Sequence, residues 1–222
     1  MTRIINKRAL RETVAIIVDG EDEKWYIAKA KEYYPNESIR RSKLKPEMVQ
    51  KKKCKDLFSA AKEKLSEGFS FVVLILDFDT IHRDPSEYSY FCDIYQRYQG
   101  VKNKAGRKND KWMANLRVLI NNPCLEYWYL LHFKSTSKFY AQYEDLKRDL
   151  RGIKQLKDYD KCEDYYLKTP DIFTRLGGVS GLSTARSNMA KNAFCISTCL
   201  AKGASEMGLL FDFFDCLDNK NI

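Results

Sequence analysis

The stretch Phe71-Val72-Val73-Leu74-Ile75-Leu76-Asp77-Phe78-Asp79 decides the fold class of this chain. Each residue from 71 to 76 is apolar, and the run stops abruptly at an aspartate. A strand that is half exposed alternates apolar and polar residues, whereas one that is apolar throughout is covered on both faces. The run therefore predicts a buried strand in a parallel sheet that has helices on each side.

Two shorter runs of the same kind lie before and after this strand. Val14–Val18 ends at Asp19-Gly20, and Leu116–Ile120 ends at Asn121-Asn122-Pro123. Helical spacing of apolar residues separates the three runs, and it predicts helices over residues 21–34, 48–66, 91–95 and 125–133. Alternating strands and helices predict an α/β fold with a mostly parallel central sheet flanked by helices.

The strand signals disappear beyond about residue 138. Helical patterns take their place, over residues 143–156, 159–167, 170–176, 185–200 and 207–217. We therefore expect an α/β core over residues 1–137 and a helical extension over residues 138–222 that packs on the same sheet.

The composition limits the classes of function. Of 222 residues 44% are hydrophobic, which excludes global disorder, and 39 Lys and Arg against 30 Asp and Glu give a net charge of +9 that favours a polyanionic partner. The longest apolar run is too short to cross a bilayer, so no membrane is expected. Seven cysteines without a C-x-x-C pair predict a reduced, cytoplasmic protein. We interpret Cys195 and Cys199 as a core stripe of a helix.

Acidic residues gather where the predicted strands end. Asp19 and Glu23 follow the first strand, Asp77 and Asp79 follow the second, and Glu126 follows the third. Open α/β sheets bind ligands at this edge, and Mg²⁺ takes carboxylate oxygens. These five residues are the candidate catalytic set. Asp19, Asp77 and Asp79 are the candidate ligands of Mg²⁺ or of Mn²⁺ in its place, since Asp77 and Asp79 would point to one side of an extended backbone.

Each acidic group also has a structural reading. An acidic first helical turn offsets the helix dipole, and a D-x-D can form a turn with an aspartate cap. Two acidic clusters that converge at one edge of a sheet would, however, repel each other unless a cation or a proton intervened. The convergence favours a metal site.

Basic residues occur mainly in two segments that we expect to be loops beside the acidic edge. The run Lys51–Lys53 we interpret instead as a solvated helix face. Candidate contacts to the phosphates of a nucleic acid are Arg40, Arg41, Lys43, Lys45, Lys102, Lys104, Arg107, Lys108 and Lys111.

Three motifs resemble the RloB-like proteins, a family with a TOPRIM-type core. They are I-I-V-D-G-E-D-E-K-W-Y at residues 16–26, L-I-L-D-F-D at residues 74–79, and N-P-C-L-E-Y-W-Y-L-L-H-F at residues 122–133. The third is the most specific, and the resemblance covers roughly the first 135 residues. It implies a metal-dependent phosphoryl-transfer core in a protein associated with restriction and anti-phage defence. Asp19 stands where the TOPRIM glutamate is usual, so either the metal lies closer to the backbone or Glu23 takes over that role.

Three hypotheses of function follow from the residues and the resemblance together. The first is a Mg²⁺-dependent nuclease acting on RNA, with tRNA as one candidate, or on DNA, as an anti-phage effector. The second is a non-cleaving nucleic-acid-binding or regulatory module. The third is a subunit that works with an ATPase partner, a frequent neighbour of the family, or as a homo-oligomer. His82 is a candidate proton shuttle or a solvated side chain, and for His132 a packing role and a catalytic role both stay open.

Overall fold

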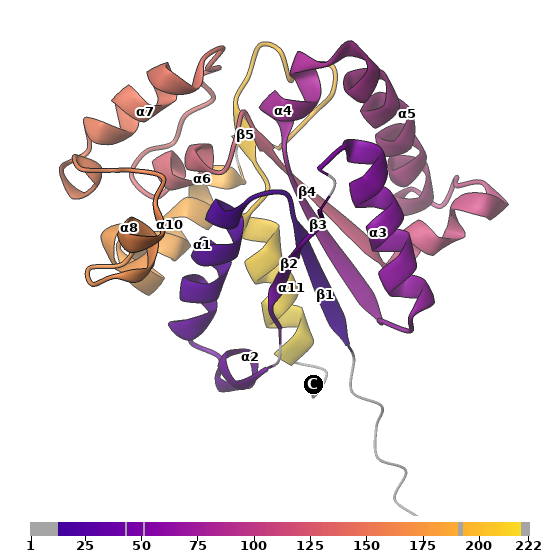
Figure 1. Cartoon of the computed structure of the whole chain (residues 1–222), viewed down its shortest axis with the longest axis horizontal. Coiled ribbons are helices and arrows are strands. Elements are labelled where there is room, and N and C mark those ends of the chain that lie inside the picture. The colour runs from indigo at the N-terminus through magenta and orange to yellow at the C-terminus, as the bar shows by residue number, and fades with distance from the viewer. Residues whose placement is uncertain (1–12, 43, 51, 191–192, 219–222) are drawn as a thin grey trace, which may run out of the picture.

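The computed structural model describes residues 13–42, 44–50, 52–190 and 193–218. Among these residues, five strands form one sheet in the order β2-β1-β3-β4-β5. The strands are β1 (Val14–Val18), β2 (Pro46–Met48), β3 (Phe71–Asp77), β4 (Leu116–Asn122) and β5 (Ala204–Ser205). The first four run parallel, and β5 pairs antiparallel with the end of β4 (Figure 1). The predicted mostly parallel α/β fold is confirmed.

Helices cover both faces of this sheet (Figure 1). The α-helices are α1 (Glu21–Glu32), α2 (Glu37–Arg41), α3 (Cys54–Ser66), α4 (Phe78–Arg83), α5 (Pro85–Lys102), α6 (Glu126–Leu131), α7 (Tyr143–Arg151), α8 (Glu163–Leu167), α9 (Ile172–Arg175), α10 (Gly178–Met189) and α11 (Gly208–Asp218), and the 3₁₀ segments are η1 (Lys108–Asn115) and η2 (Lys154–Leu156). Helices α3, α4 and α5 lie on one face, while α1, α6 and the helices of the C-terminal third lie on the other.

The two faces of β3 explain why its sequence is apolar throughout. Val73 and Ile75 join the core under α1, α6 and α11, whereas Val72, Leu74 and Leu76 join the core under α3 and α5. Each of these five side chains is completely buried. The central strand β3 therefore contributes side chains to the cores on both faces of the sheet.

Residues from both halves of the sequence share the first of these cores. Trp128 donates its indole N–H to the hydroxyl of Tyr26 at 2.6 Å, and its ring stacks on Phe211 with centroids 6.3 Å apart. All three side chains are buried. The C-terminal helices thus complete the core on this side of the sheet, and the boundary at residue 137 stays a prediction.

Four local predictions are wrong, because partners distant in sequence override the local pattern. Met48, expected to begin a helix, instead ends β2, which pairs with β1, and α3 begins only at Cys54. The two-residue β5 lies in a region where no strand was expected. The expected loop over residues 99–111 is largely helical, with α5 running to Lys102 and η1 starting at Lys108. Instead of a helix over 185–200, α10 begins after Gly177, whose φ of 88° favours glycine, and ends at Met189.

The expectations about thiols and membranes have separate outcomes. Cys199 is buried in a turn, whereas Cys195 is exposed and precedes that turn, so neither lies on a helix and the predicted core stripe is wrong. Within the described part of the chain, no helix combines the length and the apolar character needed to cross a membrane.

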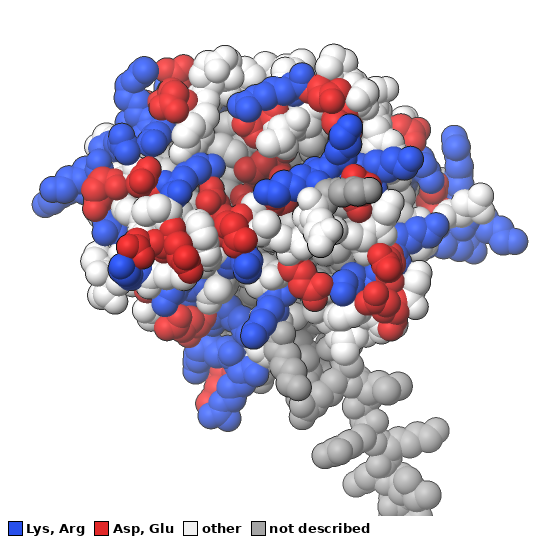
Figure 2. Space-filling model, in the orientation of Figure 1, with Lys and Arg blue, Asp and Glu red and all other residues white. Residues whose placement is uncertain are grey.

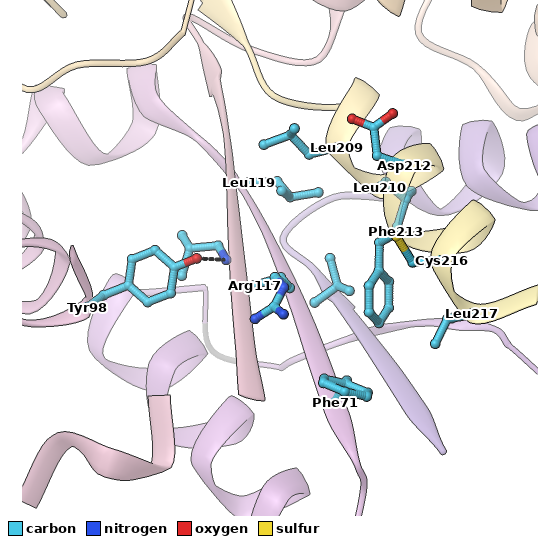
Figure 3. Close-up of a pocket in the computed structure, with 12 residues that line it drawn as sticks. Phe71, Tyr98, Arg117, Leu119, Leu209, Leu210, Asp212, Phe213, Cys216 and Leu217 are labelled. Carbon is cyan, nitrogen blue, oxygen red and sulfur yellow. Dashed lines mark hydrogen bonds between the residues drawn. The ribbon is translucent and has the colours of Figure 1, made fainter. Parts of the chain in front are cut away.

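Side chains occupy the outer edge of β4 where β5 does not reach. Lys102 Nζ donates to the carbonyl of Leu116 at 2.7 Å, and the N–H of Val118 donates to the hydroxyl of Tyr98 at 3.3 Å (Figure 3). Farther along, the N–H of Ile120 donates to Glu206 Oε2 at 3.0 Å. The hydrogen-bonding groups of this edge are thus bonded within the chain.

A hollow of about 470 Å³ lies between α11 and strands β3 and β4. Its walls are mainly apolar, with Phe71 on one side and Leu209 and Phe213 of α11 on the other (Figure 3). It opens near the start of β3, at the opposite end of that strand from Asp77.

Candidate metal centre

Three carboxylates converge at the carboxyl edge of the sheet. Asp19 follows β1, Glu23 lies in the first turn of α1, and Asp77 ends β3. One oxygen from each lies within 4.8 Å of the others, and Asp19, Glu23 and Asp77 are the only group of three or more candidate ligands that the described residues form. Glu23 is only 2% exposed, and the two aspartates are partly buried.

Local backbone geometry explains how Asp19 and Glu23 meet. At Gly20 a Cβ atom would lie 2.4 Å from Glu23 Oε2, so glycine leaves room for this carboxylate to approach the end of β1. The N–H of Asp77 donates to Asp19 Oδ2 at 3.4 Å, which links the ends of the two strands. Asn121, opposite Asp77 in the sheet, donates through Nδ2 to Asp77 Oδ1 at 3.3 Å. The parallel pairing of β1, β3 and β4 thus brings the residues at the ends of these strands together.

The electrostatics of the cluster favour a cation. Burial raises the pKa of Asp19 to about 6, and it raises the pKa values of Glu23 and Asp77 well above their ordinary range. Repulsion among the three carboxylates adds to the rise for Glu23 and Asp77. A divalent ion would remove this repulsion, and hard carboxylate oxygens are the ligands that Mg²⁺ prefers. The donor set therefore fits Mg²⁺.

Asp79 lies next to this group without forming part of it. The chain does not stay extended after Asp77 as expected, because α4 begins at Phe78 and places Asp79 in its first turn. The Asp79 carboxylate pairs with Arg83 at 2.8 Å. The backbone N–H of Asp79 donates to the carbonyl of Pro123 at 2.9 Å. The structure thus brings Glu23, rather than Asp79, together with Asp19 and Asp77.

Glu126, at the start of α6, is completely buried beside the cluster, where its charge raises the pKa values of Glu23 and Asp77. Its Oε1 accepts a hydrogen bond from the hydroxyl of Tyr159 at 2.7 Å and forms an ion pair with Lys161 Nζ at 2.7 Å. Sequence reasoning missed both partners, because they come from the helical extension and carry no motif of their own.

The two histidines lie in different environments. His132 is buried, its Nδ1 is 3.2 Å from the carbonyl of Leu176, and burial lowers its pKa to about 3. It is therefore neutral at physiological pH and packs in the core, which favours the packing role over the catalytic one. His82 is exposed and stacks on Phe78, with ring centroids 5.9 Å apart.

The predicted phosphate-binding residues lie away from the acidic edge, so their expected position is wrong. Arg40, Arg41 and Lys45 precede β2, while Lys102, Lys104, Arg107, Lys108 and Lys111 precede β4. A segment that enters a parallel strand lies at its amino end, and the seven residues of β4 separate that end from Asn122. Lys43 lies outside the described residues. Arg41 pairs with Glu37, and Lys102 bonds backbone carbonyls of η1 and β4.

Other basic side chains do approach the acidic edge. Burial raises the pKa of Asp22, and the charges of Lys161 and Lys52 partly oppose that rise. Lys52 follows β2 and precedes α3, so it is close to the cluster rather than on a helix face as expected. Figure 2 shows acidic and basic side chains interspersed over one face of the molecule.

A hollow of about 510 Å³ adjoins the cluster through Asp79 and Pro123. Aromatic residues Phe78 and Phe139 line it together with Arg83. A cavity of this size with a few charged groups suits a ligand the size of a nucleotide. Of the acidic residues at this edge, Asp79 lines the hollow, whereas Asp19, Glu23 and Asp77 are not among its lining residues.

Comparison with known proteins gives one match. A family model described as RloB-like protein matches residues 14–210, which includes most of the helical extension and is longer than the stretch whose motifs carried the resemblance. No curated protein and no solved structure among those compared matches the chain.

Proposed function

The chain belongs to the RloB-like protein family, and on that premise we propose that it is a divalent-cation-dependent nuclease that cleaves a phosphodiester bond in nucleic acid. We propose RNA as its first substrate, with tRNA as one candidate, DNA as the alternative, and anti-phage defence as its role. The observation that carries the proposal is the convergence of Asp19, Glu23 and Asp77 at the carboxyl edge of the sheet.

Each carboxylate has a part in this proposal. Asp19, Glu23 and Asp77 would hold Mg²⁺, with Mn²⁺ able to replace it. When bound, such an ion stabilises charge on a phosphate and lowers the pKa of a nearby water. Asp79, whose pKa is raised by burial, faces the adjoining hollow and would accept the proton of the attacking water at its carboxylate. Arg83 holds this carboxylate in place at 2.8 Å.

The surroundings support a polyanionic substrate. The net charge of +9 attracts nucleic acid over a long range, and Lys52 supplies positive charge close to the cluster. Phe78 and Phe139 in the adjoining hollow offer apolar surface against which a base could pack. These features support a nucleic-acid substrate whose phosphate would lie near the carboxylates and whose base would lie in the hollow.

The test compares the wild-type protein with Asp77→Asn and Glu23→Gln. Each is incubated with total RNA and with plasmid DNA in Mg²⁺, Mn²⁺ or EDTA. We expect each substitution to lower cleavage by at least about 100-fold, the order found when one electrostatic stabiliser of a transition state is removed. Asp93→Asn, at a side chain that is 68% exposed, is the matched control and should cleave normally. Cleavage that survives both substitutions and EDTA would overturn the proposal.

A further inference from the structure

The ammonium group of Lys161 lies between two carboxylates at the edge of the metal centre. Its Nζ is 2.7 Å from Glu126 Oε1 and 2.9 Å from Asp22 Oδ2. The ring of Tyr143 lies below it, with Nζ 4.8 Å from the ring centroid. Although burial lowers the pKa of Lys161, the charges of Glu126 and Asp22 raise it above the ordinary value, so the side chain stays a cation at all physiological pH values.

Glu126 shows that this position is built for a cation. The residue is completely buried, and its Oε2 has no hydrogen-bond partner among the described residues. A buried carboxylate is costly unless a positive charge and hydrogen bonds compensate it. The hydroxyl of Tyr159 and the ammonium of Lys161 supply this compensation at Oε1 alone.

This position adjoins the cluster of Asp19, Glu23 and Asp77. Asp22 directly precedes Glu23 in the first turn of α1, and the charge of Glu126 acts on both Glu23 and Asp77. The acidic edge therefore offers two neighbouring cation positions, one framed by three carboxylates and one framed by Glu126 and Asp22. Enzymes that transfer phosphoryl groups often fill two such positions with two metal ions about 4 Å apart.

We propose that the Lys161 ammonium is the permanent second cation of this centre, so that the chain binds a single divalent ion, at Asp19, Glu23 and Asp77. The inference rests on the proposed metal centre and specifies the number of ions that it holds. The ion pairs with Glu126 and Asp22 hold the Lys161 ammonium, and nearby Tyr159, which is buried and accepts hydrogen bonds from Arg151 at 2.9 and 3.0 Å, anchors the backbone of this segment. Removing the ammonium would leave both oxygens of Glu126 and Asp22 Oδ2 available to a second divalent ion.

The experiment counts Mn²⁺ ions on the purified, metal-free full chain by calorimetric titration and by the electron paramagnetic resonance signal of free Mn²⁺. We expect one ion per wild-type chain and two per Lys161→Met chain. Lys168→Met removes a lysine that pairs with Asp164 at 2.7 Å on the surface, and this matched control should bind one ion. The double variant Lys161→Met/Glu126→Gln should also bind one, because the second position then lacks its buried carboxylate.

The outcomes separate the inference from the proposed function. Two ions on the wild-type chain, or a single ion on a folded Lys161→Met chain, would overturn the inference and leave the metal centre intact. Absence of any Mn²⁺ binding by the wild type would refute the metal centre itself. If Lys161→Met does not fold, Glu126→Gln decides: we expect one ion per chain, whereas loss of binding would show that Glu126 is a ligand of the first ion.

Discussion

Replacing Asp19 by asparagine should stabilise the metal-free protein at neutral pH. Burial raises the pKa of Asp19 from its ordinary value of 3.8 to about 6. The folded chain therefore holds this proton more tightly than the unfolded chain does. Stability from the bound proton is fully present below about pH 4 and is lost as the pH rises through about 6. Asparagine imitates the protonated side chain and keeps an oxygen that can accept the hydrogen bond from the N–H of Asp77.

The size of the effect follows from the same pKa. A rise from 3.8 to about 6 corresponds to about 3 kcal/mol at neutral pH, which for a chain of this length is a melting temperature higher by about 10 °C. We expect Asp19→Asn to exceed the wild type by up to this amount in EDTA at about pH 7.5, and to equal it at about pH 4.

Magnesium should reverse the order at neutral pH. Saturating Mg²⁺ should raise the melting temperature of the wild type, because an ion that binds the folded chain alone stabilises it. The effect on Asp19→Asn should be much smaller, since one ligand charge is missing. Thermal melts followed by circular dichroism, with Asp93→Asn as the control, measure both effects. If Asp19→Asn proved less stable than the wild type in EDTA at neutral pH, the reasoning that burial of the Asp19 carboxylate destabilises its charged form would be wrong.

Three further predictions concern single side chains. Gly20→Ala should weaken Mn²⁺ binding by about tenfold in a calorimetric titration, because the new Cβ would lie 2.4 Å from Glu23 Oε2. Gly100→Ala, whose nearest neighbours are 3.9 Å away, is the control and should bind Mn²⁺ normally. Equal affinities of the two variants would refute a role for Gly20. Tyr159→Phe should lower the free energy of unfolding, measured in urea, by about 1–3 kcal/mol, since it removes a hydrogen-bond donor to buried Glu126. The hydroxyl of Tyr143 has no hydrogen-bond partner among the described residues, so Tyr143→Phe should change this free energy little. A thiol reagent should label exposed Cys195 well before buried Cys54 and Cys124, and peptide mass spectrometry measures the labelling of each. Labelling of all three thiols at one rate would contradict the packing around α3 and α6.

The acidic edge could be predicted because the signal for it is local. Strands β1 and β3 are continuous apolar runs, and each is followed at once by an aspartate. In parallel strands this order along the chain decides which edge of the sheet the carboxylates occupy. The sequence therefore predicted that Asp19 and Asp77 share one edge of the sheet, with Glu23 as a residue that can take over the role of Asp19.

The order of segment and strand along the chain also determines where the basic segments lie, and their predicted position disregarded it. Lys45 and Lys108 come before parallel strands, which places them at the amino edge whatever their charge. Lys161 is a different case, since it reaches Glu126 only because η2 and α8 fold back over α6. Nothing near Lys161 in the sequence signals that contact. The predicted position of Asp79 was wrong for a third reason. An apolar pattern does not distinguish a helical turn that starts at Phe78 from a strand that continues through it.

The edges of the sheet have a consequence for the behaviour of the protein at high concentration. An open strand edge is a template on which another chain can add a strand, and such pairing leads to fibrils and aggregates. Here Tyr98, Lys102 and Glu206 already bond the outer edge of β4, and the opposite edge is only the three residues of β2, which begins with Pro46. The groups of β4 that are bonded in this way are not free to pair with another molecule, and β2 and β5 offer only three and two residues for such pairing.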